Sequence, residues 1–311
     1  MYSLAQLKKG VKSPRSGIME LNSFIHQGGD AFNSKGSNFL TEDWDTLAIL
    51  DSCRYDLFRD RHSLPGRLES RISRGGGTYE FLKGNIADRE FHDTVYVTAN
   101  PQFHYHREEL GGSFHDVRNI WKNRWNEELR TVPPDVTTDA ALEAAEEYPH
   151  KRLLVHYNQP HAPYIGPAGR QLDGLSGKAR EGESENSQSL LRTLAHDIRP
   201  SFTAAEHRLA YTENLDLALS GVELLLEERP GRTVVTADHG QLLGERVGPI
   251  PIRYHGHRRG IHVKELVKVP WLVHESGERP EITTEASKRY DDSIDGTEVV
   301  ERLHDLGYVE Y

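Results

Sequence analysis

The stretch "TVVTADHGQLLGE" (residues 233–245) joins a run of β-branched residues directly to Asp238, His239 and Gly240. β-Branched residues favour strands, and an almost continuous apolar run is typical of a strand that is buried on both faces of a parallel sheet. Such a strand holds the side chains at its carboxyl end in fixed positions. The stretch therefore predicts a buried sheet that presents an acid and an imidazole at its edge.

Other short apolar runs have the same character, and polar segments compatible with helices separate them. These runs are "TLAILD" (46–51), "TVYVTAN" (94–100), "RLLVHYN" (152–158) and "VPWLVH" (269–274). Residues 137–148 and 208–228 carry apolar side chains at helical spacing. The alternation predicts an α/β fold, a three-layer α/β/α sandwich with a central, mostly parallel sheet.

The 311 residues are enough for one large α/β domain. We expect an irregular N-terminal arm over residues 1–43, packed on a catalytic domain over residues 44–311. A polar insertion rich in Gly, Ser and Glu interrupts this domain at about 166–201. Residues 295–311 carry a capping residue, an apolar stripe and a glycine stop, which predict a terminal helix.

Composition excludes several classes of protein. The net charge of −10 argues against a general nucleic-acid binder, so no nucleic-acid partner is predicted. No apolar run approaches the roughly 20 residues of a membrane span, and the basic first residues lack the apolar core of a secretory signal. These features predict a cytoplasmic location, with a peripheral membrane role left open. The single cysteine, Cys53, excludes an internal disulfide.

Polar side chains follow several of the predicted strands. Asp51 ends one, His156 and Asn158 end another, and the Asp-His pair at 238–239 ends a third. The carboxyl ends of strands in an open α/β sheet are where ligands collect, and Zn²⁺ and Mn²⁺ accept carboxylate and imidazole ligands. An isolated Asp-His-Gly tripeptide favours a helix cap beside a surface histidine. A second carboxylate on another strand reverses that preference and predicts a divalent metal site.

The segment "LAILDSCRYDLF" (47–58) offers a choice between two carboxylates. Asp51 directly follows the apolar run, so it is the expected ligand, whereas Asp56 falls within the following helix as a structural partner of Arg54. Cys53 could act as a nucleophile. A small residue at a junction between a strand and a helix is more often buried packing.

The segment "SRGGGTYEFLKGN" (73–85) places three glycines before Thr78 and a helix-compatible run. Glycines permit close backbone approach, and free N–H groups at a helix N-terminus favour an anion. A threonine hydroxyl is a weak nucleophile unless a metal lowers its pKa. The alternative is a threonine that only caps the helix.

Two further segments carry histidines. "NQPHAPYIG" (158–166) holds His161 between two prolines, in a stiff loop after a predicted strand. "RYHGHRRGIHVKELVKVPW" (253–271) holds His255, His257 and His262 beside two arginines. This second group would bind an anion through charge and hydrogen bonds, or form a solvated polar loop.

Taken in chain order, these motifs resemble the alkaline phosphatase superfamily, specifically its sulfatase-like hydrolase and transferase branch. The resemblance covers the chain from about residue 44 onward, and "TADHG" with its flanking residues is its most specific part. It lies in "AILDSCRYD" (48–56), the glycines before Thr78, "QPHAPY" (159–164), "VVTADHGQLLGE" (234–245), "GH" (256–257) and the ending "ERLHDLGYVE" (301–310). The resemblance implies an alkaline phosphatase-like sandwich.

The resemblance also implies a divalent cation, Zn²⁺, Mn²⁺, Mg²⁺ or Ca²⁺, held by Asp51, Thr78, Asp238 and His239. In this superfamily a nucleophile bound to the metal attacks phosphorus or sulfur, and Thr78 occupies its place.

Two other residues, His161 and His257, receive roles from the resemblance. His161 would contact the transferring group or stabilise the leaving oxygen, and His257 would bind the substrate or a second metal. Arg54 is a candidate substrate-binding residue.

The chain departs from the family in two ways. True sulfatases oxidise a cysteine in a Cys-x-Pro-x-Arg sequence to formylglycine, whereas "RYD" follows Cys53. The second Asp and His of two-metal members have no clear counterpart. We therefore expect a hydrolase or transferase of phosphate monoesters or diesters, acting on a small-molecule, glycan or lipid-headgroup ester. The alternatives are a sulfate-ester hydrolase lacking formylglycine and a non-catalytic scaffold.

Overall fold

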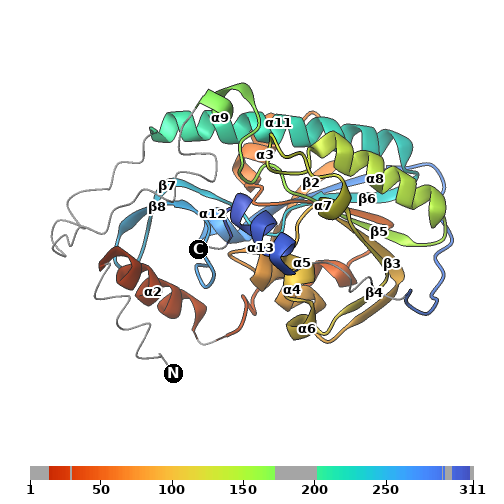
Figure 1. Cartoon of the computed structure of the whole chain (residues 1–311), viewed down its shortest axis with the longest axis horizontal. Coiled ribbons are helices and arrows are strands. Elements are labelled where there is room, and N and C mark those ends of the chain that lie inside the picture. The colour runs from red at the N-terminus through yellow and green to blue at the C-terminus, as the bar shows by residue number, and fades with distance from the viewer. Residues whose placement is uncertain (1–13, 29, 172–201, 289, 291–295, 309–311) are drawn as a thin grey trace.

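A computed structural model describes residues 14–28, 30–171, 202–288, 290 and 296–308. Its centre is a seven-stranded sheet in the order β2-β9-β6-β1-β5-β3-β4 (Figure 1). These strands span β1 Thr46–Leu50, β2 Arg67–Ile72, β3 Glu90–Thr98, β4 Ser113–Asn119, β5 Arg152–Tyr157, β6 Gly231–Thr236 and β9 Lys268–Ser276. β1, β3, β4, β5 and β6 form a parallel set, and β9 pairs antiparallel with both β2 and β6. The prediction of a mostly parallel sheet is confirmed.

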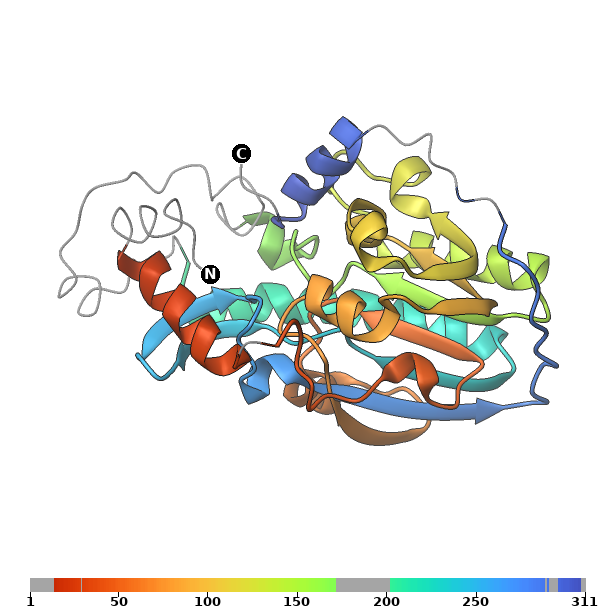
Figure 2. The same ribbon diagram turned by 90° about the horizontal axis from the view of Figure 1, so that it is seen from below.

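Helices cover both faces of this sheet. α8 and α11 lie together on one face, and α4, α5 and α13 lie on the other (Figure 1, Figure 2). The described helices are α2 Pro14–Gln27, α3 Tyr55–Arg61, α4 Thr78–Ile86, α5 Gln102–Tyr105, α6 Arg107–Leu110, α7 Ile120–Asn123, α8 Pro134–Glu147, α9 Pro167–Gln171, α11 Ala204–Glu228, α12 Lys264–Val267 and α13 Gly296–Asp305, with a 3₁₀ turn at Phe39–Thr41. The predicted three-layer α/β/α sandwich is confirmed, as is a terminal helix.

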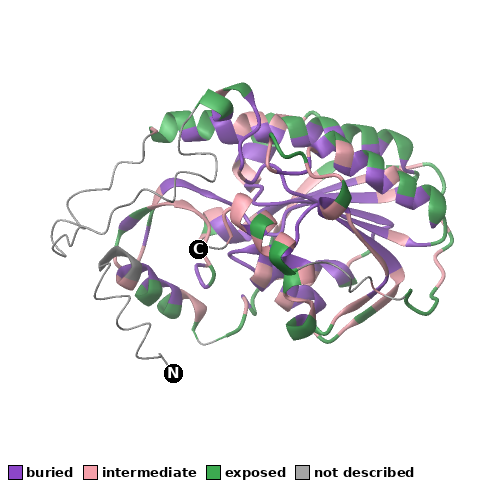
Figure 3. Ribbon diagram, in the orientation of Figure 1, coloured by how far each residue is buried: buried purple, intermediate pink, exposed green. Residues whose placement is uncertain are grey.

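Burial explains which strands the sequence predicts. All five residues of β1 are buried, and the central strands are buried on both faces (Figure 3). β2 and β4 lie at the two edges of the sheet, and most of their residues are partly exposed. Edge strands need no continuous apolar run, and the sequences "RLESRI" and "SFHDVRN" have none. Both strands were therefore missed.

A second, smaller core lies beside the main sheet. Strands β7 (Leu242–Val247) and β8 (Ile252–Gly256) form an antiparallel hairpin, and α2 packs against it. Ile18 and Met19 of α2 join the buried apolar side chains of the hairpin. Residues 14–27 are thus a helix rather than the expected irregular arm, because one face of that helix completes this core.

Some of the expected segments lie outside the described residues, namely residues 1–13 of the arm and 172–201 of the polar insertion. Within the described ranges, no helix combines the length and apolar character needed to cross a bilayer.

A histidine pair, with His207 buried and His255 partly exposed, joins α11 to the hairpin and predicts a loss of stability in acid. The Nδ1 atoms of His207 and His255 lie 2.9 Å apart, and burial, followed by the charge of His255, lowers the pKa of His207 to about 3. The unfolded chain therefore binds a proton that the folded chain does not between about pH 6.5 and pH 3. The stability is present above this window and is lost as the pH falls through it, by up to about 1.4 kcal/mol per pH unit.

Urea denaturation at pH 7.5 and pH 4.5 measures this effect. We expect His207→Gln to lose less stability between the two conditions than the wild type, and His150→Gln, at an exposed histidine, to behave as the wild type. Equal losses in all three proteins would contradict the assignment to His207.

Candidate active site

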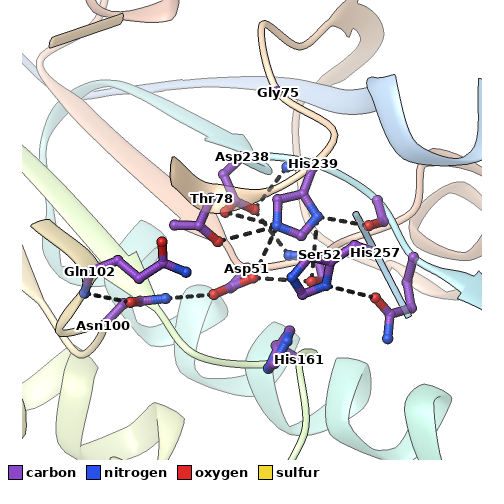
Figure 4. Close-up of polar contacts among 12 residues, drawn as sticks. Asp51, Ser52, Gly75, Thr78, Asn100, Gln102, His161, Asp238, His239 and His257 are labelled. Carbon is purple, nitrogen blue, oxygen red and sulfur yellow. Dashed lines mark hydrogen bonds and ion pairs between the residues drawn. The ribbon is translucent and has the colours of Figure 1, made fainter. Parts of the chain in front are cut away.

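The predicted metal ligands lie together at the carboxyl ends of two neighbouring strands. Asp51 follows β1, the pair Asp238 and His239 follows β6, and β1 and β6 are adjacent and parallel. Thr78 is the first residue of α4 and faces the same point (Figure 4). All four residues are at most 1% exposed. Each of these side chains is thus positioned by the end of a strand or the start of a helix.

The atoms of these residues have the spacing of a metal-ligand set. His239 Nε2 lies 3.2 Å from Thr78 Oγ1, 3.3 Å from Asp238 Oδ2 and 3.6 Å from Asp51 Oδ1. A tetrahedral ion with ligands at about 2.0–2.1 Å separates those ligands by about 3.3–3.4 Å. Asp238 Oδ2 is buried and has no hydrogen-bond partner among the described residues. The residues present therefore fit a divalent cation, which would satisfy this oxygen.

The hydrogen bonding of His239 is also suited to binding a metal. Its Nδ1 lies 2.8 Å from the carbonyl oxygen of Gly240. Because a carbonyl can only accept a hydrogen bond, Nδ1 carries a proton, and Nε2 is the ring nitrogen left to bind a metal. The backbone N–H of Gly240 in turn donates to Leu266 O at 2.7 Å, which fixes this turn.

The electrostatics of the two carboxylates also favour a cation. Burial, followed by the charge of Asp238, raises the pKa of Asp51 well above its usual value. Two buried carboxylates with oxygen atoms within 4.8 Å of each other repel when both are ionised. A bound divalent ion reverses this balance, because its charge favours both ionised forms.

His156 is a further candidate ligand that sequence analysis placed at a strand end but did not select. It lies on β5, beside β1, and its Nε2 is 3.8 Å from Asp238 Oδ2. Asp51, His156 and Asp238 each have a ligand atom within 4.8 Å of the others. Burial lowers the pKa of His156 to about 4, so the ring is neutral and able to bind a metal. Two imidazoles therefore compete for one pair of carboxylates.

Measurements of metal affinity would show whether His239 or His156 binds the ion. His239 contacts Thr78 and both carboxylates, so we expect His239→Ala to weaken Zn²⁺ binding by more than about 100-fold and His156→Ala by about 10-fold. Competition with a chromogenic chelator measures both constants, and circular dichroism checks that each variant is folded. The reverse ranking would assign the ion to His156.

His161 and His257 lie beside this cluster. The rings of His257 and His239 are 4.4 Å apart, and those of His161 and His257 are 5.0 Å apart. The backbone N–H of His161 donates to Asp51 O at 3.1 Å, which ties its loop to the end of β1. His257 Nδ1 lies 3.3 Å from Gln241 Oε1. The structure thus brings both histidines beside His239 and the predicted metal ligands.

The other histidines of segment 253–271 go elsewhere. His255 pairs with His207, and His262 Nε2 lies 3.6 Å from Glu80 Oε1. The carboxylate of Glu80 accepts the backbone N–H groups of Gly76 at 2.8 Å and Gly260 at 2.9 Å. Glu80 therefore connects the glycine loop before Thr78 to the loop that carries His257.

Arg54 is held by protein groups. Its guanidinium donates to Asp56 at 2.8 and 2.9 Å, to Glu245 at 2.5 Å and to the carbonyl of Gln241 at 3.1 Å. The predicted Arg54–Asp56 pair is confirmed, whereas substrate binding by Arg54 stays a prediction. Cys53 is fully buried, and burial raises the pKa of its thiol well above the usual value. Its thiolate is thereby disfavoured, as the packing interpretation expects.

Sequence reasoning missed several partners of Asp51. Asn100 Nδ2 donates to Asp51 Oδ2 at 2.7 Å, and Ser52 Oγ donates to Asp51 Oδ1 at 3.0 Å. The hydroxyl of Tyr308 donates to Asp51 Oδ2, and burial, followed by the charge of Asp51, raises the pKa of Tyr308. Asn100 ends the predicted strand 94–100, so its position was a usable signal. Tyr308 lies in the ending that resembles sulfatase-like proteins, where no role was assigned to it.

No protein-family model and no curated protein matches the chain. Solved structures similar to it include the zinc complex of the C-terminal periplasmic domain of EcEptC from Escherichia coli. That match has 12% sequence identity and a TM-score of 0.43, and it covers 78% of this chain and 75% of that chain. The soluble domain of lipooligosaccharide phosphoethanolamine transferase A from Neisseria meningitidis matches with 10% identity over 73% and 75% of the two chains, at a TM-score of 0.44. An alkaline phosphatase superfamily protein from Vibrio parahaemolyticus matches with 13% identity over 89% and 71%, at 0.37.

Proposed function

We propose that the chain is a metal-dependent hydrolase or transferase of phosphate esters, belonging to the alkaline phosphatase superfamily and using Thr78 as its nucleophile. One observation carries the proposal. Thr78 Oγ1, Asp51 Oδ1 and Asp238 Oδ2 all lie 3.2–3.6 Å from His239 Nε2, at the spacing of a ligand set. A hydroxyl that shares a cation with two carboxylates and an imidazole is placed to act as an activated nucleophile.

Asp51, Asp238, His239 and Thr78 would hold the ion, and this mixture of oxygen and nitrogen ligands suits Zn²⁺ or Mn²⁺ in particular. When bound, the ion supplies a lower pKa for the Thr78 hydroxyl and charge stabilisation for the phosphoryl oxygens. The position of Thr78 at the start of α4 adds a favourable field for negative charge.

The chain's own residues account for the bond changes. Thr78 Oγ1, after losing its proton to solvent, attacks phosphorus, so that a bond from Thr78 to phosphorus forms and the ester P–O bond breaks. The electron pair of that bond goes to the leaving oxygen, to which a protonated His161 gives a proton. Water or an alcohol then gives a proton to the now neutral His161 and attacks phosphorus through its oxygen, and Thr78 leaves with the electron pair of its bond. Hydrolysis and transfer differ only in this last acceptor.

The substrate class is a phosphate monoester or diester on a small molecule, glycan or lipid headgroup. His161 and His257, whose rings are 5.0 Å apart, would form hydrogen bonds with an anionic ester. A cytoplasmic location remains a prediction, which fractionation of native cells into soluble, membrane and secreted material tests.

A metal and substrate panel tests the proposal. The purified protein is stripped with a chelator, reloaded with Zn²⁺, Mn²⁺, Mg²⁺ or Ca²⁺, and assayed against a phosphate monoester, a phosphodiester and a sulfate ester. We expect turnover only with metal, and faster turnover of a phosphate ester than of the sulfate ester. Faster sulfate turnover would favour the sulfatase alternative. A folded protein that binds none of the ions would favour the scaffold alternative and overturn the proposal.

A further inference from the structure

Tyr308 reaches the site from the residues that follow α13. Gly307 has a φ of +79°, and the backbone N–H of Tyr308 donates to Leu303 O at 2.8 Å, so the chain turns sharply at the end of the helix. The tyrosine ring then stacks on His161, with 4.9 Å between centroids and 14° between the ring planes. This turn brings a hydroxyl to the centre of the site.

That hydroxyl contacts three site residues. It donates to Asp51 Oδ2, accepts from Asn100 Nδ2 at 3.1 Å and lies 3.3 Å from Thr78 Oγ1. All three are buried, and Asp51 and Thr78 are predicted metal ligands. The hydroxyl of Tyr308 therefore joins a carboxylate and the proposed nucleophile.

The two oxygens of Asp51 have different surroundings. Oδ1 faces His239 Nε2 at 3.6 Å and accepts a bond from Ser52 Oγ. Oδ2 accepts from Asn100 and from Tyr308. A carboxylate whose second oxygen is held in this way keeps its first oxygen directed at the cation, and loss of such an outer partner usually costs about 10–100-fold in metal affinity.

Helix docking does not need this hydroxyl. α13 is anchored by apolar side chains, since Val299, Leu303 and Leu306 are each at most 2% exposed. Arg302 also pairs with Glu127 at 2.7 Å. The polar atom of Tyr308 instead has its contacts within the site.

We propose that Tyr308 is a positioning residue, which fixes the orientation of Asp51 toward the cation and of the Thr78 hydroxyl toward the substrate. The second part rests on the proposed function of Thr78. The first part concerns metal binding alone and holds whether or not Thr78 is the nucleophile.

Tyr308→Phe tests the proposal, because it keeps the ring and its stacking on His161 and removes only the hydroxyl. We expect Zn²⁺ affinity to fall about 10–100-fold, and kcat at saturating Zn²⁺ to fall while KM changes little. The melting temperature of the metal-free protein should stay close to that of the wild type. Tyr290→Phe is the matched control, since its hydroxyl contacts His104 and Asn119, which are not among the ligands. This control should leave Zn²⁺ affinity unchanged.

A double-mutant cycle with Asn100→Ala sharpens the test. Asn100 and Tyr308 bond the same oxygen of Asp51, so their effects on Zn²⁺ affinity should be non-additive. Unchanged Zn²⁺ affinity in Tyr308→Phe overturns the proposal. Increased turnover also overturns it, because the hydroxyl would then be obstructing the substrate. If Thr78→Ala retains full activity while Tyr308→Phe loses metal, the proposed function fails and the positioning of Asp51 stands.

Discussion

Thr78→Ala is expected to reduce kcat for a phosphate ester by at least about 1,000-fold, because removal of a nucleophile leaves only binding and charge stabilisation. Three of the four ligands remain in this variant, so metal-binding measurements show whether the ion is still present. The assay uses saturating Zn²⁺ and substrate, which separates the chemical step from weaker binding of either.

Thr78→Ser is the matched control, since it retains a hydroxyl at the start of α4 and should retain most of the activity that alanine loses. Mass spectrometry of acid-quenched wild-type enzyme should detect a phosphoryl group on the peptide containing Thr78. Full activity in Thr78→Ala would exclude this nucleophile. Ser73 and Cys53 would then be tested, although the hydroxyl of Ser73 donates to Asp238 O and the thiol of Cys53 is buried.

Asp238→Asn should have the largest effect on metal binding. It removes a charged ligand whose Oδ2 lies 3.3 Å from His239 Nε2, and we expect Zn²⁺ affinity to fall by at least about 1,000-fold, beyond the 10–100-fold typical of an outer partner. The amide oxygen can still accept from the backbone N–H groups of Ser52 and His239, which Asp238 Oδ1 binds at 3.0 and 2.8 Å. The local fold should therefore survive the change.

The metal-free form of this variant should be at least as stable as the metal-free wild type. Burial, followed by the charge of Asp238, raises the pKa of Asp51, so neutralising Asp238 relieves a charge repulsion that a bound cation would otherwise offset. Urea denaturation in chelator at pH 8 measures the comparison, and Asp56→Asn, at a carboxylate paired with Arg54, serves as a control that should lose stability. A large loss of stability in metal-free Asp238→Asn would indicate a structural carboxylate.

The sequence predicts the middle of the sheet better than its borders. β1, β5 and β6 are almost wholly buried and carry nearly continuous runs of apolar or β-branched residues, which makes them recognisable without a structure. The antiparallel direction of β9 could not be predicted, because an apolar run has the same composition in a parallel and in an antiparallel strand pair. α2 was missed because its apolar residues form no single stripe: Ile18 and Met19 are buried against the hairpin, whereas Leu21, Phe24 and Ile25 are exposed.

The site shows the same division. Asp51 directly follows β1, and Asp238 and His239 lie just beyond the end of β6, so strand topology brings them together. The glycines before Thr78 mark the start of α4. His257 was separated from His255 and His262 only by resemblance, since all three lie in one polar stretch of the sequence, 253–271. Tyr308 lies 230 residues from Thr78 in the chain, and no local pattern reports a contact over that separation.

The adjacency of β1 and β6 has a thermodynamic consequence. The hydrogen bonds of the sheet place Asp51 beside Asp238, so folding alone assembles the ligand cluster. The free energy of metal binding therefore does not include the entropy cost of ordering these residues. The ion then stabilises the folded state by mass action alone, by about 2.7 kcal/mol at a free concentration one hundred times its Kd if it has no affinity for the unfolded chain. A titration of melting temperature against free Zn²⁺ should therefore give the same dissociation constant as direct binding.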